Sequence, residues 1–258
     1  MISKTITAFA FAALAGASTY GLAADFSFDR PGTGFGTGIT PVGQLAWEQG
    51  LPSASYQEST DANGQKTKQV TLNGDMLLRT GLAKDLELQL GWQGPSWSKT
   101  KTGGRNVEED GLGDVSIGLK KAIDLDDDQL SMAILAEAVI ATGNEGFSNE
   151  DDIYSLSSAV SYAYSDLLNT SITMRYEVQD GNWAVSAIPT LGYQISGKLS
   201  GYSEFIFRKA ESEEKEYALG TGLIYAVNDR MQLDAGIGVD LNGKDKGYQS
   251  GLGVSYLF

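Results

Sequence analysis

Three kinds of pattern in the chain resemble sites that perform chemistry, and each lacks a part that the chemistry requires. The acidic run that begins at Asp124 starts like a calcium-binding EF-hand loop, but Leu135 stands where that loop needs glutamate. Gly32–Gly38 reads GTGFGTG, which lacks the GxGxxG spacing of a dinucleotide-binding turn. The carboxylates near 108–110 and 149–152 could hold a divalent cation, although a solvated acidic surface is the favoured interpretation.

The composition excludes further classes of chemistry. The 258 residues include no His and no Cys, which removes imidazole and thiol catalysis and the metal ligands that these residues supply. Asp and Glu total 33 against 19 Lys and Arg, and this acidic balance argues against nucleic-acid binding. We expect no catalytic residue, no metal and no cofactor, because no spacing singles out a catalytic pair of carboxylates.

The remaining candidates are charged residues on the polar side of alternating segments. The acids are Glu48, Asp75, Glu87, Asp114, Glu137, Glu177, Glu204, Asp234 and Asp240. The bases are Arg79, Lys120, Arg175 and Arg208. All of them are candidates to line a solute path except Glu48, Asp114 and Asp240. Buried charges must pair or stay hydrated, so the set predicts either a water-filled, weakly cation-preferring pore or a packed core of salt bridges.

The elements that would position these charges are β-strands. From Gly43 onward, apolar and polar residues alternate with a period of two. The runs last about 10–14 residues, long enough to cross a bilayer obliquely and longer than usual sandwich strands. This pattern predicts an all-β fold, a transmembrane antiparallel up-and-down β-barrel of about twelve strands over 43–258. Because a sheet edge in lipid leaves backbone groups unpaired, we expect the first strand, near 43–57, to pair with the last, near 247–258.

The connections between these strands alternate between two kinds. Short ones are expected near 83–85, 124–128, 165–166, 196–198 and 228–230. Mostly longer polar ones are expected at 58–68, 99–110, 143–152, 180–182, 209–214 and 242–247. Periplasmic turns and external loops alternate in this way in outer-membrane barrels, which predicts that both termini are periplasmic. Aromatic residues cluster near both ends of the strands, as interfacial belts do. The terminal Phe258 resembles the signal that barrel-assembly machinery reads.

Two segments precede the barrel. Residues 1–23 carry one positive charge near Met1, an apolar stretch and small residues before a cleavage site after Ala23, which predicts a secretory signal peptide. Residues 24–42 are rich in glycine. This segment could enter the barrel as a partial plug through Phe28, Arg30 and Phe35, or remain a periplasmic tail. The predicted location is the outer membrane of a Gram-negative bacterium.

Several short stretches carry a resemblance to a known family. They are Asp29-Arg-Pro-Gly32, Gly36-Thr-Gly38, Pro41-Val-Gly43, Leu78-Arg-Thr-Gly-Leu82, Leu86–Gly91, Gly111-Leu-Gly-Asp114, Ala141-Thr-Gly143 and Gly253–Phe258. In their order and spacing the chain resembles the outer-membrane proteins named for the meta-pathway of phenol degradation and classed as transporters. Ala141 departs from the proline expected there. The resemblance implies passage of small, often hydrophobic or aromatic compounds across the outer membrane, and it supplies no catalytic motif.

Two candidate functions therefore remain for this chain. The first is an outer-membrane channel or transporter for small solutes, possible substrates being hydrophobic or aromatic compounds. The alternative is a structural or surface-interaction barrel with a filled lumen and no transport. The expected partners are outer-membrane lipid and lipopolysaccharide, the barrel-assembly machinery and a small-molecule solute.

Overall fold

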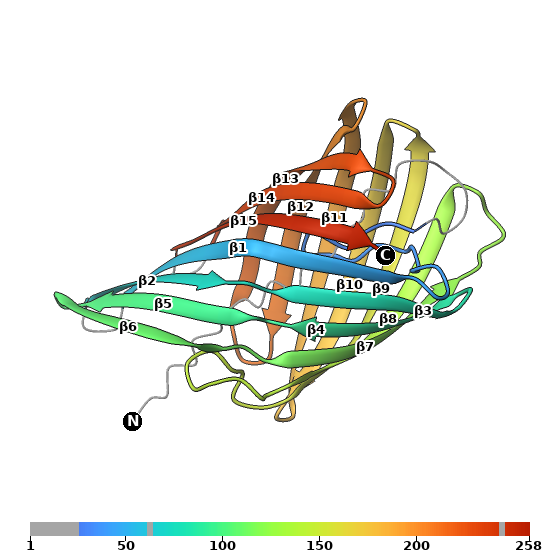
Figure 1. The fold of residues 1–258 in the computed structure, drawn as a ribbon. Helices are drawn as coiled ribbons and strands as arrows, with labels where there is room; N and C mark the ends of the chain where they lie inside the picture. The colour runs from blue at the N-terminus through green and yellow to red at the C-terminus, as the bar shows by residue number, and fades with distance from the viewer. Residues whose placement is uncertain (1–25, 61–63, 243–245) are drawn as a thin grey trace.

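The computed structural model describes residues 26–60, 64–242 and 246–258, so the predicted signal peptide lies outside the described residues. The regular structure of the described part is β-strand throughout (Figure 1). The strands are β1 (Leu45–Thr60), β2 (Lys66–Asn73), β3 (Met76–Ala83), β4 (Leu86–Trp92), β5 (Pro95–Thr102), β6 (Arg105–Leu112), β7 (Val115–Ile123), β8 (Leu130–Ile140), β9 (Ile153–Ser165), β10 (Leu168–Gln179), β11 (Asn182–Ser196), β12 (Leu199–Ala210), β13 (Lys215–Asn228), β14 (Met231–Asp240) and β15 (Lys246–Leu257).

The segments form twelve passes of one antiparallel wall. Three passes are each interrupted by two residues: β2 continues as β3 past 74–75, β4 as β5 past 93–94, and β6 as β7 past 113–114. With β1 and the eight strands β8–β15, these three split passes make twelve. Within the described chain, no helix has the length and apolar character needed to cross a bilayer.

The wall closes on itself. β1 pairs with β15 from Ala46 opposite Leu257 to Glu58 opposite Lys246. Along its other edge, β1 pairs with β3 through residues 45–49 and with β2 through residues 53–60. Both edges of β1 are therefore occupied. Closure removes the free edge that would be costly in lipid. The predicted pairing of the first strand with the last is confirmed.

The two faces of the wall differ in polarity, as a transmembrane barrel requires. Large apolar side chains are exposed on the outside, among them Ile117, Leu156 and Ile237 at 50%, 57% and 64%. Tyr154 and Tyr164 are exposed at opposite ends of β9. The alternate positions point inward and carry the buried charges described below. An apolar exterior around a polar interior is the pattern of outer-membrane barrels.

One side of the barrel is longer than the rest, at the end away from the C-terminus. The interruptions at 74–75, 93–94 and 113–114 lie beside one another, since Gly74 donates to Pro95 and Gly113 donates to Gly94 through their backbones. Above them, residues 53–60 of β1 together with β2, β5 and β6 form what we call the strand extension, which projects beyond the neighbouring strands (Figure 1). Within the described residues, β6 pairs with β5 alone.

The strand extension corrects two of the predicted loops. The stretches 58–68 and 99–110 were expected to be loops, but strands continue into both. β5 and β6 meet in a tight hairpin whose two linking residues, Gly103 and Gly104, have φ values of 58° and 84°. Two successive positive φ angles suit the right-handed twist of a β-hairpin, and glycine adopts them without steric cost.

Candidate functional site

The described part of the N-terminal segment, residues 26–42, lies inside the barrel. Its side chains and backbone bond to residues on β1, β3, β4, β7, β8, β10, β12 and β14. Only a chain surrounded by the wall can reach so many strands of one closed ring. In Figure 1 it is the blue stretch that precedes β1, and it lies toward the end of the barrel that carries the C-terminus.

Five fully buried charged residues hold the segment to the wall, and we call them the ionic cluster: Asp29, Glu48, Arg79, Glu87 and Lys120. The Arg79 guanidinium lies 2.9 Å from both Glu48 and Glu87, and 3.4 Å from Asp29. The Lys120 ammonium lies 3.2 Å from Asp29. The backbone N–H groups of Asp29 and Arg30 donate to Glu48, at 3.0 and 2.7 Å. Each ion therefore has a partner of opposite charge, which a buried charge requires.

Two further residues of the segment, Arg30 and Thr33, bind carboxylates of the wall. The Arg30 guanidinium lies 2.7 Å from Asp75 and 3.4 Å from Asp234. The backbone and hydroxyl of Thr33 both donate to Glu204, at 3.0 and 2.7 Å. Arginine suits this position because its planar fork can serve two carboxylates at once.

Apolar contacts accompany the polar ones. Phe35, which is 2% exposed, packs against Ala133, Leu135 and Ala159, while its N–H donates to the Thr173 hydroxyl. A second apolar group forms around Phe28, which packs with Ala46 and Leu257. The apolar core of this molecule therefore lies within the barrel, between the segment and the wall.

The structure places all ten predicted lumen residues on the inner side of the wall, eight of them in three groups. Arg79, Glu87 and Lys120 meet in the ionic cluster, while Asp75, Asp234 and Glu204 bind the segment. Arg208 binds Glu177 at 3.1 Å, and also Glu213 and Glu216. Glu137 and Arg175 take part in no ion pair within the described chain. The three predicted plug residues, Phe28, Arg30 and Phe35, are all buried.

Sequence reasoning missed several residues of this interior. Asp29 was seen only as part of a short motif, yet it joins two strands through Arg79 and Lys120. Gln89 donates to Asp29 and Glu87, and the Tyr202 hydroxyl donates to the Pro31 carbonyl. The position of Gln89 on the polar side of its strand was the available signal.

A second polar centre fixes the loop after β8, residues 141–152, and it lies beyond the last β7–β8 pair, Val115 with Ile140. The buried Asp114 carboxylate accepts hydrogen bonds from the backbones of Thr142, Gly143 and Asn149, and from the Ser148 hydroxyl. Burial opposes its ionisation, but the bonds from Ser148, Asn149 and Gly143 prevail and hold the pKa of this carboxyl below its ordinary value.

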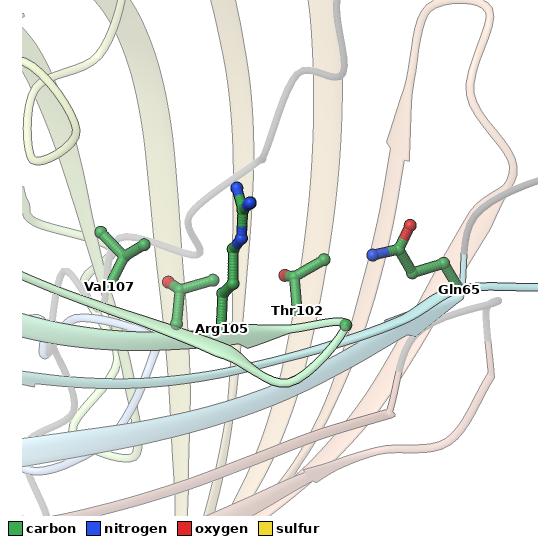
Figure 2. A pocket seen from close by; sticks show the side chains of 6 residues that line it. Gln65, Thr102, Arg105 and Val107 are labelled. Atoms are coloured by element: carbon green, nitrogen blue, oxygen red, sulfur yellow. The ribbon is translucent and has the colours of Figure 1, made fainter.

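A recess at the tip of the strand extension has a volume of about 350 Å³ and is lined by residues of the β5–β6 hairpin and by Gln65 (Figure 2). Thr102, Arg105 and Val107 point to the same side of the hairpin in Figure 2. It lies apart from the ionic cluster. No group of three or more potential metal ligands occurs among the described residues.

The chain is similar to known outer-membrane proteins. A sequence profile of the family described as "Putative MetA-pathway of phenol degradation" matches residues 28–258. No curated protein matches the chain in sequence.

Three solved structures share the barrel. The COG4313 outer membrane channel from Pseudomonas putida F1 is 14% identical, with a TM-score of 0.62 over 85% of this chain and 97% of that one. The translocator domain of the autotransporter NalP from Neisseria meningitidis is 10% identical, with a TM-score of 0.56 over 84% and 89%. A mutant of the TodX monoaromatic hydrocarbon channel is 9% identical, with a TM-score of 0.50 over 84% and 91%. At these identities the likeness establishes the fold.

Proposed function

The chain belongs to the family described as "Putative MetA-pathway of phenol degradation", and from this we propose that it is an outer-membrane channel for small solutes, including hydrophobic or aromatic compounds. The observation that carries the proposal is a closed barrel whose polar interior is occupied by a separate segment of the same chain. A movable segment could vary passage through such a lumen, whereas side chains of the wall alone would fill it permanently. The solved channels with the same fold support this proposal.

We infer that residues 24–42 act as a partial plug. The segment occupies the lumen through ion pairs and hydrogen bonds rather than through strand pairing, apart from one isolated bridge between Val42 and Gly81. Contacts of this kind can be exchanged for water without opening the wall.

A specific observation favours the alternative, a filled barrel that acts through its loops without transport. The ionic cluster is fully buried and its ions are matched by partners, which is what a permanent packed core would show. The autotransporter domain also shows that this fold serves other roles, since a fold alone does not determine function.

We propose an orientation in which the termini and short turns face the periplasm, with residues 1–23 removed as a signal peptide on export. In that orientation Phe258 would be available to barrel-assembly machinery and the loops to lipopolysaccharide. The support is the asymmetry of the two ends: short links such as 166–167 and 197–198 lie at the end of the termini, and the twelve-residue link 141–152 lies at the other. We also propose that the protein is no enzyme.

Permeation tests the channel proposal. The mature protein, residues 24–258, would be refolded into liposomes and compared for uptake of a small sugar and of benzenesulfonate, an aromatic ion that does not cross bare bilayers. We expect uptake of the aromatic solute above empty liposomes, and faster uptake when residues 24–42 are removed or when Asp29→Ala and Arg30→Ala release the segment in the intact chain. Absence of uptake in all three forms would refute the channel and favour the filled barrel.

A further inference from the structure

One cation of the inner wall has no acidic partner. The other inward-facing bases, Arg79, Lys120 and Arg208, all form ion pairs. Arg175 forms none within the described residues. Its Nε donates to the Ser157 hydroxyl at 3.3 Å, and its Nη2 is buried without any hydrogen-bond partner.

The nearest carboxylate on the same strand is already bound elsewhere. Glu177 lies two residues beyond Arg175 on the same face of β10, but its Oε1 accepts from Arg208. A guanidinium with an unpaired nitrogen in a confined interior is costly, and the usual remedy is an anionic partner. The missing partner is conspicuous because acids outnumber bases in this lumen.

The residue that separates Arg175 from the next inward-facing arginine is small. Ser186 on β11 pairs directly with Arg175 on one side and with Arg208 on the other. Two strand spacings separate the arginine backbones, about 9–10 Å, and only a serine stands between them. The Ser186 hydroxyl makes no hydrogen bond within the described chain, so an uncommitted donor lies between the two arginines.

The position of Arg175 relates it to the segment. Thr173, two residues before Arg175 and on the same inward face, accepts the hydrogen bond from Phe35. Arg175 therefore lies two residues nearer the loop end of β10 than the contact between Thr173 and the segment. Ile206, half-buried and two residues before Arg208, adds apolar surface to the same wall.

We propose that Arg175, with the Ser186 hydroxyl and with Arg208 beside it, binds a small organic carboxylate on the loop side of the segment. The inference rests on the proposed function and names a substrate class for it. The guanidinium of Arg175 would donate to the carboxylate, which planar forked donors match well, and the Ser186 hydroxyl would donate to its second oxygen. An apolar ring on the ligand would contact Ile206.

Calorimetric binding of benzoate to the folded barrel in detergent tests the site without any need for transport. Benzamide, which has nearly the same shape and no charge, is the ligand control. We expect benzoate to bind more tightly than benzamide, Arg175→Gln to weaken benzoate about tenfold or more, and Arg175→Lys to restore part of the loss. Lys121→Gln removes an equal charge from a pair with Asp85 at an exposed turn, and it should leave binding unchanged.

The outcomes separate the two proposals. Equal binding of benzoate and benzamide, or benzoate binding by Arg175→Gln that matches the unaltered protein, would overturn the carboxylate site while leaving the channel intact. Arg175-dependent binding without any solute flux would keep the site and refute transport. If Arg175→Gln fails to fold, Arg175→Lys and Ser186→Val are measured in its place. Each must weaken the binding of benzoate and leave the binding of benzamide unchanged.

Discussion

Asp114 shows how one carboxylate can organise a whole loop. It accepts bonds from three backbone N–H groups, one hydroxyl and the Asn149 amide, all within residues 142–149. Hydrogen bonds to a charged group are stronger than those to a neutral one. The loop after β8 therefore depends on the charge of this side chain as well as on its position.

We predict that Asp114→Asn lowers the free energy of opening this loop by on the order of 2 kcal/mol, because the remaining bonds are made to a neutral acceptor. The measurement is cleavage after Glu145 and Glu150 by a glutamate-specific protease, with the sites mapped by mass spectrometry. Asp110→Asn, at an exposed position on β6, is the matched control. Equal cleavage of Asp114→Asn and the unaltered protein would contradict the role of the charge.

The same residue predicts a dependence on pH. Because folding lowers the pKa of the Asp114 carboxyl, its contribution is complete above the pKa of the unfolded chain and is lost as the pH falls through the lower folded value. The loop should therefore open at acidic pH in the unaltered protein, and Asp114→Asn should lack this dependence.

At the scale of single residues, the alternation predicted which side chains face inward, but it did not predict which of them bind one another. Alternation placed Arg79, Glu87 and Lys120 on one face because strand geometry fixes the direction of each side chain. It could not show that Asp29 binds both Arg79 and Lys120, because the segment that carries Asp29 has no periodicity. Arg175 and Arg208 likewise resemble each other in the sequence, and only the structure shows that Glu177 serves the second.

At the scale of elements, the segment passes very close to β3. A Cβ atom added to Gly81 would lie 2.1 Å from the Thr40 carbonyl oxygen and 2.9 Å from the Pro41 carbonyl carbon. Both are backbone atoms and cannot rotate away. The glycine of the stretch Leu78-Arg-Thr-Gly-Leu82 is thus required by the approach of another part of the chain.

We predict that Gly81→Ala displaces the C-terminal part of the segment and raises the single-channel conductance of the intact barrel, in the direction of the truncated form. Gly238→Ala is the matched control: it also adds a methyl group within a strand, where the nearest atom lies at an ordinary contact distance of 3.5 Å. Unaltered conductance in Gly81→Ala would mean that the segment does not limit passage.

The strand extension is the part of the fold whose strands the sequence did not predict. Charged stretches such as 99–110 suggested loops because a strand inside the bilayer could not tolerate them. That restriction does not hold for a strand that continues past a bilayer, and β5 and β6 do continue through lysine and glutamate residues, as the 2.7 Å pair of Lys99 with Glu108 shows. The pair Gly103-Gly104 was the available signal of a hairpin.

At the scale of the whole molecule, the count of inward-facing charges should govern ion preference. The wall carries nine candidate acids and four bases, and removal of 24–42 leaves them in place while it takes away two acids, Asp25 and Asp29, and one base, Arg30. We therefore predict that the truncated barrel prefers potassium over chloride, measured as a reversal potential in a potassium chloride gradient. The preference should decline as salt screens the charges. Preference for chloride would contradict this account.

The closed ring also has a consequence for the order of assembly. The partners of the segment come from β1 and β3 at the beginning of the barrel, from β7 and β10 in its middle, and from β12 and β14 near its end. No partial barrel presents them together. The segment precedes all of these strands in the chain, yet it can reach its final position only after they have paired, so its burial requires that they are in register.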